Sequence, residues 1–540
     1  MDYYSSFIKT IIQRDLEKKK NKEIITRFPP EPNGFLHLGH ARAIVINFEL
    51  AKYFKGKTYL RYDDTNPTKE KKLYVDAILE DIKWLGYNPH KICFASDYFN
   101  IIYEKAVLLI KKNKAFVDDL DKEKIKQYRC DLLKPGKESP FRNRSIKENL
   151  KLFEQMQKGF FKPGEKVLRA KIDMSSSNMN LRDPVIYRIL DAYTLNNKHY
   201  FIFPTYDFAH PLEDAIEKIN YSLCSLEFED HRPLYNWVIK ETEMTNIPQQ
   251  IEFARLNILQ TCLSKRILKE LVNLNLVKGW DDPRMPTLVG LKKKGYTPEA
   301  IRSFIFETGL SKNNNSVNPN MLYSCLRNDL QPKTKQLMVV TDPIKVTIIN
   351  YPENKKEFID VPFHKEINMG KRKVCFSRNI YIEKNDFQIT QKDPKSKKLF
   401  LGTEVRLLYF YFIKAIDIIK NKQGEIIEIL ATYDPETKSG SGFNKRKPNG
   451  TIHFVEMTTS KQININFYQN LFKNDNPKDI LKDFNYNSWI IKKGWIEGFV
   501  DLNHNYEKFQ FLRKGYFHLE KTIKYQNNFH EIVSLKKSHK

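Results

Sequence analysis

The chain has 540 residues, of which 41% are apolar and 36 are Phe, enough for several packed cores. No run approaches the roughly 20 apolar residues that a membrane span requires, and the N-terminus lacks a basic-then-apolar signal pattern. The six cysteines form no C-x-x-C pair, so neither a zinc site nor a disulfide framework is predicted. A cytoplasmic protein without membrane attachment is therefore expected.

The formal net charge of +26 favours a polyanionic partner, with nucleic acid first and an anionic membrane second. A compositional origin is the alternative. Lys, Ile, Asn and Tyr are all abundant, as an AT-rich coding sequence would produce without selection for binding. Charge alone leaves both explanations open.

The N-terminal part of the chain predicts a nucleotide-binding fold. After a short amphipathic helix from Phe7 to about Leu16, "NKEIITRF" reads as a strand, "HARAIVINFELAKYF" as a helix and "GKTYLRYDD" as a second strand. This βαβ pattern predicts parallel strands in a doubly wound sheet, where ligands lie beyond the carboxyl ends of the strands. The turn Pro29–His40 and the pair Asp63–Asp64 are then expected on the same rim.

The pattern of predicted helices and strands divides the rest of the chain into further parts. Residues 100–205, with a strand in "KVLRAKIDM", predict an inserted α/β module, and "YFIFPTYDFAHPLEDAIEKI" predicts a strand and a helix where the nucleotide fold resumes. The Rossmann-type catalytic domain would thus comprise residues 1–99 and 206–265. Residues 266–334 predict a helical connecting subdomain. In residues 335–540, apolar and polar residues alternate in short stretches separated by turn residues. This pattern predicts an all-β region of barrel or sandwich type, with a loop at "KSGSGFNKRKPNG".

The stretch "RFPPEPNGFLHLGHARAI" carries the first chemical signal, because a strand end, a rigid turn and a helix start follow one another. Free N–H groups and the helix dipole make a helix N-terminus a phosphate site. Gly39 removes a β-carbon where an adenine or ribose could lie against the backbone. His37 and His40 offer donors to charge that develops on an α-phosphate.

Two further signals are weaker on their own. In "NILQTCLSKRILKE", Ser264, Lys265 and Arg266 are expected in a loop just before a helix, where Lys265 could neutralise the β- and γ-phosphates of a nucleotide. Tyr206, in "YDFAH", offers a hydroxyl to a small polar ligand, and the carboxylate of Asp63 suits an ammonium group. Each of these features alone is more often structural.

Together the motifs resemble the class I glutaminyl-tRNA synthetases of bacterial type. "HLGH" is similar to the HIGH element of that family, and "LSKR" to its KMSKS-type element. Leu263 replaces the usual Met, and Pro211 and Glu213 depart from the family pattern after "YDFAH". Other matching stretches, in order, are "RFPPEPNG", "RYDDTNP", "SPFRNRS", "LRAKID", "RDPVIYRI", "YDFAHPLEDAIE", "SLCSLEFEDHRPLYNW", "EFARLNI", "GWDDPRMPTLVGL" and "GYTPEAIR".

The resemblance implies ATP-dependent ligation of L-glutamine to tRNA through a glutaminyl-adenylate, with Mg²⁺ accompanying ATP. It implies catalytic roles for His37, His40 and Lys265, and a glutamine pocket formed by Asp63, Tyr206, Arg27 and Gln250. The implied ATP-site residues are Glu31, Pro32, Asn33, His37, Leu38, Gly39, His40, Ala41, Arg42, Ala43, Ser225, Arg255, Leu256, Leu263, Ser264 and Lys265.

The resemblance also implies a monomer whose inserted module holds the tRNA acceptor end and whose two β-barrels read anticodon bases. Leu132 is the implied wedge near the first base pair, and Asp230 lies beside the acceptor stem. The remaining implied tRNA contacts are Ser311, Lys312, Asn313, Asn314, Asn315, Ser316, Val317, Asn318, Lys398, Arg406 and Arg513.

Other functions remain to be weighed. A glutamyl-tRNA synthetase of the archaeal and eukaryotic type shares the barrel region, but "PEPNG", "YDF" and "SLCSLEF" favour glutamine. A non-catalytic tRNA-binding paralogue would show damaged catalytic elements, and these are intact. Full-length barrels argue against a truncated tRNA-modifying relative. The absence of a long N-terminal appendage favours a bacterial-type enzyme.

Overall fold

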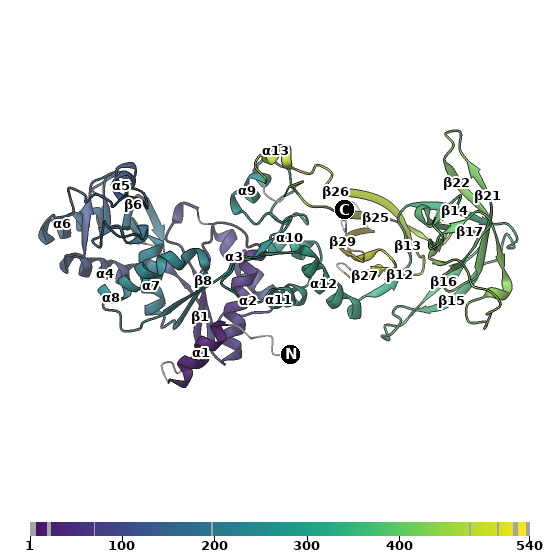
Figure 1. The fold of residues 1–540 in the computed structure, drawn as a ribbon, viewed down its shortest axis with the longest axis horizontal. Helices are drawn as coiled ribbons and strands as arrows, with labels where there is room; N and C mark the ends of the chain where they lie inside the picture. The colour runs from purple at the N-terminus through teal and green to yellow at the C-terminus, as the bar shows by residue number, and fades with distance from the viewer. Residues whose placement is uncertain are drawn as a thin grey trace.

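The computed structural model describes residues 7–18, 23–69, 71–195, 198–391, 393–474, 477–504, 507–521 and 527–535. The molecule is elongated, and the inserted module, the nucleotide-binding sheet, the connecting helices and the barrel region follow one another along its long axis (Figure 1). No helix in the described part of the chain combines the length and apolar character that crossing a membrane requires.

The nucleotide-binding sheet is parallel, as the βαβ pattern predicted. Two blocks of parallel strands meet where the N–H of Asn220 donates to the carbonyl of Ile25 (3.2 Å), so β8 lies beside β1. The resulting order, β3-β2-β1-β8-β9, places a topological switch between β1 and β8, where doubly wound sheets bind ligands. The strands are β1 (Ile25–Phe28), β2 (Lys57–Tyr62), β3 (Lys91–Phe94), β8 (Tyr221–Ser225) and β9 (Gln249–Phe253).

Apolar helix faces cover this sheet. The predicted N-terminal helix forms as α1 (Phe7–Glu17), whose fully buried Ile8 and Ile12 pack with strand residues such as Leu223. Helix α2 (Leu38–Tyr53) is apolar on most of its surface, because strands lie against one side and helices α11 (Pro298–Glu307) and α12 (Pro319–Leu330) against the other. The helix α3 (Lys72–Trp84) completes the same core.

The inserted module is an antiparallel sheet of order β4-β5-β6-β7 with helices packed on it. The strand in "YFIFP" is β7, which pairs with β6, so it closes the inserted sheet and the nucleotide fold resumes only with α7. The strand predicted in "KVLRAKIDM" ends at Ala170, because the N–H of Ile172 donates to the Asp183 carboxylate (2.7 Å) instead of a strand. The elements of the module are α4 (Phe99–Lys111), β4 (Ala115–Asp118), α5 (Lys122–Arg129), α6 (Ile146–Gln157), β5 (Val167–Ala170), β6 (Val185–Leu195) and β7 (Lys198–Pro204). The helices that follow, α7 (Tyr206–Ile216) and α8 (Arg232–Glu241), pack against its core.

The connecting region is helical, as predicted, with one difference at the "LSKR" element. Helix α9 (Lys265–Asn273) begins at Lys265, so Lys265 and Arg266 lie in its first turn rather than in the loop before it. The helix extends this far because Leu268 and Leu271, three residues apart, are both buried on one face. A short helix, α10 (Leu288–Lys293), and the pair β10 (Asn257–Ile258) and β11 (Ser316–Val317) complete the region.

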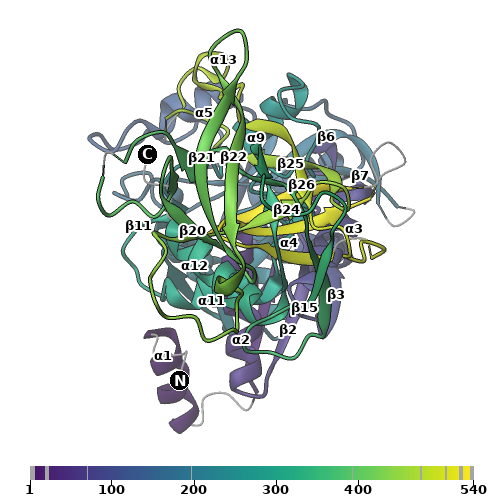
Figure 2. The same ribbon diagram turned by 90° about the vertical axis from the view of Figure 1, so that its right-hand side faces the viewer.

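The C-terminal region forms two seven-stranded sheets, each curled into a nearly closed barrel (Figures 1 and 2). Residues 438–450 connect strands without forming one, as predicted. The first barrel contains β14 (Pro343–Ile348), β17 (Asn379–Glu383), β20 (Glu404–Leu407), β21 (Phe412–Lys420), β22 (Ile426–Asp434), β23 (Thr451–Ile452) and β24 (Phe454–Glu456). The second contains β12 (Lys335–Leu337), β13 (Val339–Val340), β25 (Lys461–Tyr468), β26 (Trp489–Ile496), β27 (Lys508–Phe511), β28 (Gly515–Glu520) and β29 (Asn528–Ser534).

One part of the second barrel reaches back to the nucleotide-binding region. We call residues 469–488, between β25 and β26, the bridging segment; it includes the short helix α13 (Ile480–Asp483). Its Leu471, Phe472 and Phe484 form one apolar cluster with Leu268 and Leu271 of α9. Barrel and α9 are therefore in direct contact.

Candidate active site at the carboxyl ends of the parallel strands

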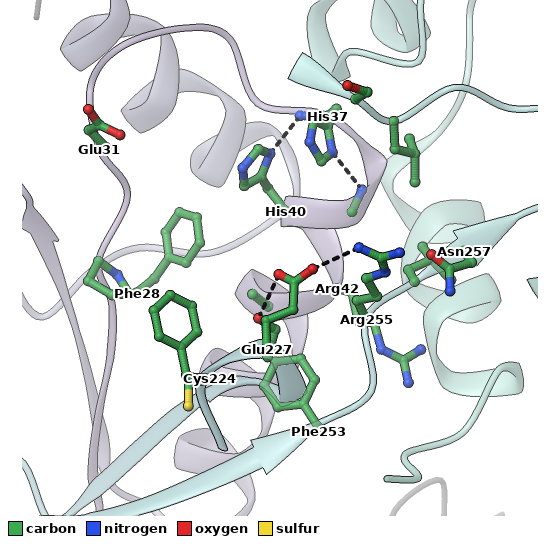
Figure 3. Close-up of a pocket in the computed structure, with 18 of the residues that line it drawn as sticks. Phe28, Glu31, His37, His40, Arg42, Cys224, Glu227, Phe253, Arg255 and Asn257 are labelled. Atoms are coloured by element: carbon green, nitrogen blue, oxygen red, sulfur yellow. Dashed lines mark hydrogen bonds and ion pairs between the residues drawn. The ribbon is translucent and has the colours of Figure 1, made fainter. Parts of the chain in front are cut away.

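A cavity of about 1280 Å³ opens at the carboxyl ends of β1, β2, β8 and β9, beside the start of α2 (Figure 3). This volume exceeds that of typical small-molecule pockets, and so suits more than one substrate. The Pro29–His40 turn and Asp63 contribute to the lining, as predicted, whereas Asp64 is buried outside it, where its carboxylate accepts hydrogen bonds from Ser96. The predicted site residues that line it are Arg27, Glu31, His37, Gly39, His40, Arg42, Ala43, Asp63, Tyr206, Ser225, Arg255, Leu256, Leu263 and Ser264.

His37 and His40 hold each other in place at the start of α2 (Figure 3). The N–H of Gly39 donates to Nδ1 of His37 (3.0 Å), and the N–H of His37 donates to Nδ1 of His40 (3.1 Å). The centroids of the two imidazole rings lie 3.9 Å apart. Because each Nδ1 accepts a hydrogen bond, the proton of each neutral ring sits on Nε2, so both rings present an N–H donor.

The environment keeps both rings neutral at physiological pH. Burial, and then the positive charge of Lys265, lowers the pKa of His37 to about 4. Burial, followed by the charges of His37 and Lys265, lowers the pKa of His40 well below its usual value. Both side chains therefore act as neutral hydrogen-bond donors in a site that already carries a lysine charge.

Glycine is required at position 39 because the ring of His37 fills the space that a side chain would occupy. A β-carbon at this position would lie 2.8 Å from Cε1 of His37, closer than real β-carbons approach other atoms. It would also lie 3.8 Å from Cδ1 of Leu263. The histidine ring thus occupies the space beside Gly39, and the "HLGH" and "LSKR" elements meet at this point.

Lys265 lies across the "PNG" turn. A β-carbon on Gly34 would overlap Cε of Lys265 and would lie 3.1 Å from its Nζ. The absence of a side chain at Gly34 therefore allows the lysine to pass, and this places an ammonium group near His37 and His40. Two motifs more than 200 residues apart thus form one positively charged rim.

Arg42 lines the same cavity, but its guanidinium is bound at the end of α11. It is 4% exposed, its Nη1 donates to Oγ1 of Thr308 (2.7 Å) and its Nη2 donates to the carbonyl of Gly309 (2.8 Å). Burial lowers its pKa to about 10. Arg42 therefore ties α2 to the end of α11 as well as lining the cavity.

Asp63 and Tyr206, the two predicted contacts of the amino acid, both line the cavity. Oδ1 of Asp63 accepts a hydrogen bond from Oγ1 of Thr65 (2.7 Å), and burial raises the pKa of the carboxyl group. Tyr206 is the first residue of α7, and its ring stacks on His210 with centroids 4.7 Å apart. Burial raises the pKa of the phenol well above its usual value, so its hydroxyl can donate or accept.

Arg27 lines the cavity, but its side chain belongs mainly to a buried network. Nε pairs with Asp214 (3.0 Å), Nη1 donates to the carbonyl of Leu223 (2.8 Å), and Nη2 contacts both Ser222 and His210. Four of the five guanidinium N–H bonds are thus used within the described part of the chain. One N–H on Nη1 is left over from these contacts.

Arg61 extends this network beneath the cavity floor. It is fully buried and pairs with Asp214 (2.6 Å), Glu217 (2.7 Å) and Glu213 (2.9 Å). Glu213, one of the departures in "YDFAHPLEDAIE", therefore contacts Arg61 rather than Tyr206. Buried charges of this kind are retained only when paired, so the network fixes the position of the strand ends that carry the site.

The far side of the cavity is polar. Oγ of Ser225 donates to Oε2 of Glu227 (3.4 Å), and Nη1 of Arg255 donates to Oε1 of the same residue (2.7 Å; Figure 3). Glu227 was not predicted as a site residue, although it lies in the "SLCSLEF" stretch. It positions two residues that were predicted, Ser225 and Arg255.

Some predicted residues contribute only through the backbone or the core. Leu38 and Ala41 are buried in α2, and Pro32 and Asn33 shape the turn without lining the cavity. Pro477, in the bridging segment, lines the cavity, and no pattern in the sequence signals this. Further lining residues that no motif predicted include Thr65, Asn66, Arg188, Glu227 and Phe228.

The predicted tRNA contacts near the cavity are exposed, Asn318 included, apart from Val317, which is half-buried in β11. Leu132 is 69% exposed on a turn of the inserted module. The carbonyl of Asp230 accepts hydrogen bonds from the amides of Asn178 (2.7 Å) and Asn180 (3.1 Å), which leaves the carboxylate at the surface. Residues 311–316 are exposed, and Ser316 also lines the cavity.

The three predicted barrel contacts differ in their surroundings. Lys398 is half-buried. Arg406 donates to the carbonyl of Thr437 (3.0 Å) and lies over the Phe412 ring (4.3 Å). Arg513 forms a bidentate pair with Asp386 (2.6 and 2.7 Å). Both arginines are thus engaged within the barrel, and Arg513 remains 47% exposed.

No three His, Cys, Asp or Glu side chains in the described ranges gather in a way that could hold a metal ion. Among the predicted ATP-site cations, Arg255 and Arg42 line the cavity, the latter with its guanidinium bonded to Thr308 and Gly309, whereas Lys265 lies against Gly34 beside the rim.

Comparison with known proteins identifies the family. Residues 23–332 match tRNA synthetases class I (E and Q), catalytic domain, and residues 335–434 and 451–520 match two anti-codon binding domains of the same group. The glutamine--tRNA ligase of Clostridium perfringens is 52% identical over 548 residues, covering 100% of this chain and 99% of that protein. That of Clostridioides difficile is 52% identical, covering 99% and 98%, and that of Bradyrhizobium diazoefficiens 46%, covering 95% and 92%. The chain belongs to the class I tRNA synthetases of the E and Q group.

Proposed function

We propose that this protein ligates L-glutamine to the 3′ end of glutamine-accepting tRNA, with ATP as the energy source and AMP and pyrophosphate as products. The observation that carries the proposal is that Lys265, packed against Gly34, lies close enough to His37 and His40 at the cavity rim to lower the pKa of both rings. Full-length relatives named glutamine--tRNA ligase support the choice of glutamine.

ATP would bind with its phosphates at the start of α2. The glutamine carboxylate attacks the α-phosphate, and the protein lowers the barrier by positioning and by charge stabilisation. The Nε2–H groups of His37 and His40 donate to the phosphate oxygens as charge develops there. The ammonium group of Lys265 neutralises the departing pyrophosphate, and Mg²⁺ arrives as part of the nucleotide substrate.

Glutamine would bind between Asp63 and Tyr206. The Asp63 carboxylate takes the substrate ammonium group, and the Tyr206 hydroxyl meets the side-chain amide, with Arg27 and Gln250 shaping the pocket. A wrong substrate such as glutamate leaves a buried donor or acceptor unmatched, which costs about 1 to 3 kcal/mol for each group.

The tRNA would span the long axis of the molecule. We propose that residues 100–205 hold the acceptor end and that the barrels at residues 335–540 read the anticodon. The inserted module adjoins the nucleotide-binding sheet (Figure 1), and Arg188 of its strand β6 lines the cavity, which supports the first assignment. A monomeric state and a cytoplasmic location stay predictions from the sequence.

The test is a charging assay with labelled glutamine and glutamate in competition, using purified protein and the cognate tRNA. Glutamine is expected to be charged at least tenfold more efficiently, and a preference for glutamate would identify the glutamyl enzyme instead. Lys265→Ala is the matched variant: it should lose charging and keep tRNA binding. Unchanged charging by this variant would remove Lys265 from the mechanism.

A further inference from the structure

Gln250 has an unusually constrained side chain. It lies on β9, is 8% exposed, and lines a cavity of about 10 Å³ together with Tyr206, Cys224 and Phe228. This is roughly the space of one water molecule. The small cavity adjoins the large one, because Tyr206, Cys224 and Phe228 line both.

Both hydrogen-bond donors of the Gln250 amide are used within the protein. Nε2 donates to the carbonyl of Phe228 (3.0 Å) and to Oε1 of Glu252 (2.9 Å). An amide has two N–H donors and one carbonyl acceptor. With both donors used, the group that Gln250 can still offer is its carbonyl oxygen, which is a hydrogen-bond acceptor.

Glu252 fixes this orientation. It lies two residues further along the same strand, so its side chain emerges on the same face, and it is fully buried. Its Oε1 also pairs with Nε of Arg232 (3.2 Å). A carboxylate only accepts hydrogen bonds, so a reversed Gln250 amide would set its oxygen against two acceptors, Glu252 and the Phe228 carbonyl.

We propose that Glu252 is a positioning residue for amino-acid selection: it holds the Gln250 amide so that an acceptor faces the substrate side chain, directly or through one water. This rests on the proposed function. An acceptor at that position matches the NH₂ group of a glutamine side chain. It opposes the carboxylate of glutamate, which has no proton to donate and carries a like partial charge.

Two substitutions of Glu252 distinguish the effect of its hydrogen-bond acceptor from the effect of its negative charge. Glu252→Gln and Glu252→Met both remove the negative charge beside Arg232, and both keep the length of the side chain. Only the Met variant removes the oxygen that accepts from Gln250. The Met variant should raise KM for glutamine about tenfold, and lower the preference for glutamine over glutamate by a similar factor, since one hydrogen bond is lost. Its kcat and its KM for ATP should change less than about threefold.

The Gln variant should remain within about threefold of the wild type in all of these constants. A Gln variant as impaired as the Met variant would overturn the proposal, because charge rather than orientation would then matter. A Met variant with unchanged KM and unchanged selectivity would also overturn it. Thermal unfolding is measured first, and Glu252→Leu replaces the Met variant if that protein does not fold.

A double variant tests whether Glu252 acts through Gln250. With Gln250→Met in place, Glu252→Met should add no further loss of selectivity. A further loss would show a general structural role and contradict the proposal. The wild-type assay distinguishes failure of the proposed function from failure of the role of Glu252. A wild type that prefers glutamate refutes the proposed function. A glutamine-specific wild type with an equally specific Met variant refutes only the role of Glu252.

Discussion

The side chain of Lys265 passes over Gly34, at a distance that leaves no room for a β-carbon on the glycine. The glycine belongs to the turn before α2, and the lysine opens α9, so this single contact joins the "PNG" turn to the "LSKR" element. Neither element forms the rim alone. The contact makes Gly34 a residue whose role can be tested separately from that of the lysine.

Gly34→Ala should displace Lys265 and reduce charging. We expect kcat to fall by about 100-fold, comparable to the loss of one charge-stabilising group, with tRNA affinity unchanged. Steady-state charging and a filter-binding assay measure the two effects. In a Lys265→Ala background the clash is absent, so Gly34→Ala should then have no further effect. A full additional loss in that background would show that the alanine acts through the turn itself.

His37 combines two roles that substitutions can separate, since its Nδ1 caps α2 and its Nε2 offers a donor to the cavity. Asn places an oxygen at the Nδ1 position but has no group at Nε2, whereas Gln places an N–H near the Nε2 position and removes the cap. His37→Asn should keep the free energy of unfolding and lose about 100-fold in kcat. His37→Gln should retain more activity and lose about 1 kcal/mol of stability. Urea unfolding measures the stability of the two variants, and charging assays measure their activity. The reverse ranking of the variants would contradict the roles assigned to Nδ1 and Nε2.

The contact between the barrel and α9 should matter for activity. Phe484 lies in the bridging segment and is 2% exposed against α9. Phe484→Ala leaves a cavity there, so α9 and Lys265 lose support, and we expect charging to fall about tenfold at saturating tRNA. Phe509→Ala is the control, because it removes an equally buried ring from the second barrel without touching α9. Equal losses in both variants would point to barrel stability rather than to the contact.

His518 should make the protein less stable in acid. It is 1% exposed in the second barrel, and burial, followed by the charge of His530, lowers its pKa to about 3. The unfolded chain takes up a proton near pH 6.5 and the folded chain does not, so this residue costs stability as the pH falls below 6.5. The cost is about 2 kcal/mol at pH 5 relative to pH 8.

His518→Asn should therefore flatten the decline of the unfolding free energy between pH 8 and pH 5 by about that amount. Urea unfolding across this range gives the slope, and the value at pH 8 gives the cost of the substitution itself. Parallel curves for the variant and the wild type would show that His518 does not titrate as its burial requires.

The nucleotide-binding half of the fold could be predicted because its signals are local. The alternation in "NKEIITRF", the apolar spacing of "HARAIVINFELAKYF" and the prolines between them depend only on neighbouring residues. The strand in "YFIFP" pairs with the strand directly before it, β6, so it belongs to the inserted module, whose predicted range ends at residue 205. The start of α9 was misjudged because the burial of Leu268 and Leu271 comes from the bridging segment.

The sequence by itself determined which groups are available: the "HLGH" pair on a helix start, Lys265 within a basic stretch, and a Tyr and an Asp that follow strands. Only the tertiary structure decided what each group meets. Lys265 packs against Gly34, and most of the Arg27 guanidinium N–H groups bind within a buried network. The Gln250 amide donates to Glu252, and Pro477 of the bridging segment lines the cavity. Residue types and short-range spacing encode local conformation, whereas these contacts join residues far apart in the chain, and such contacts exist only after packing has brought the elements together.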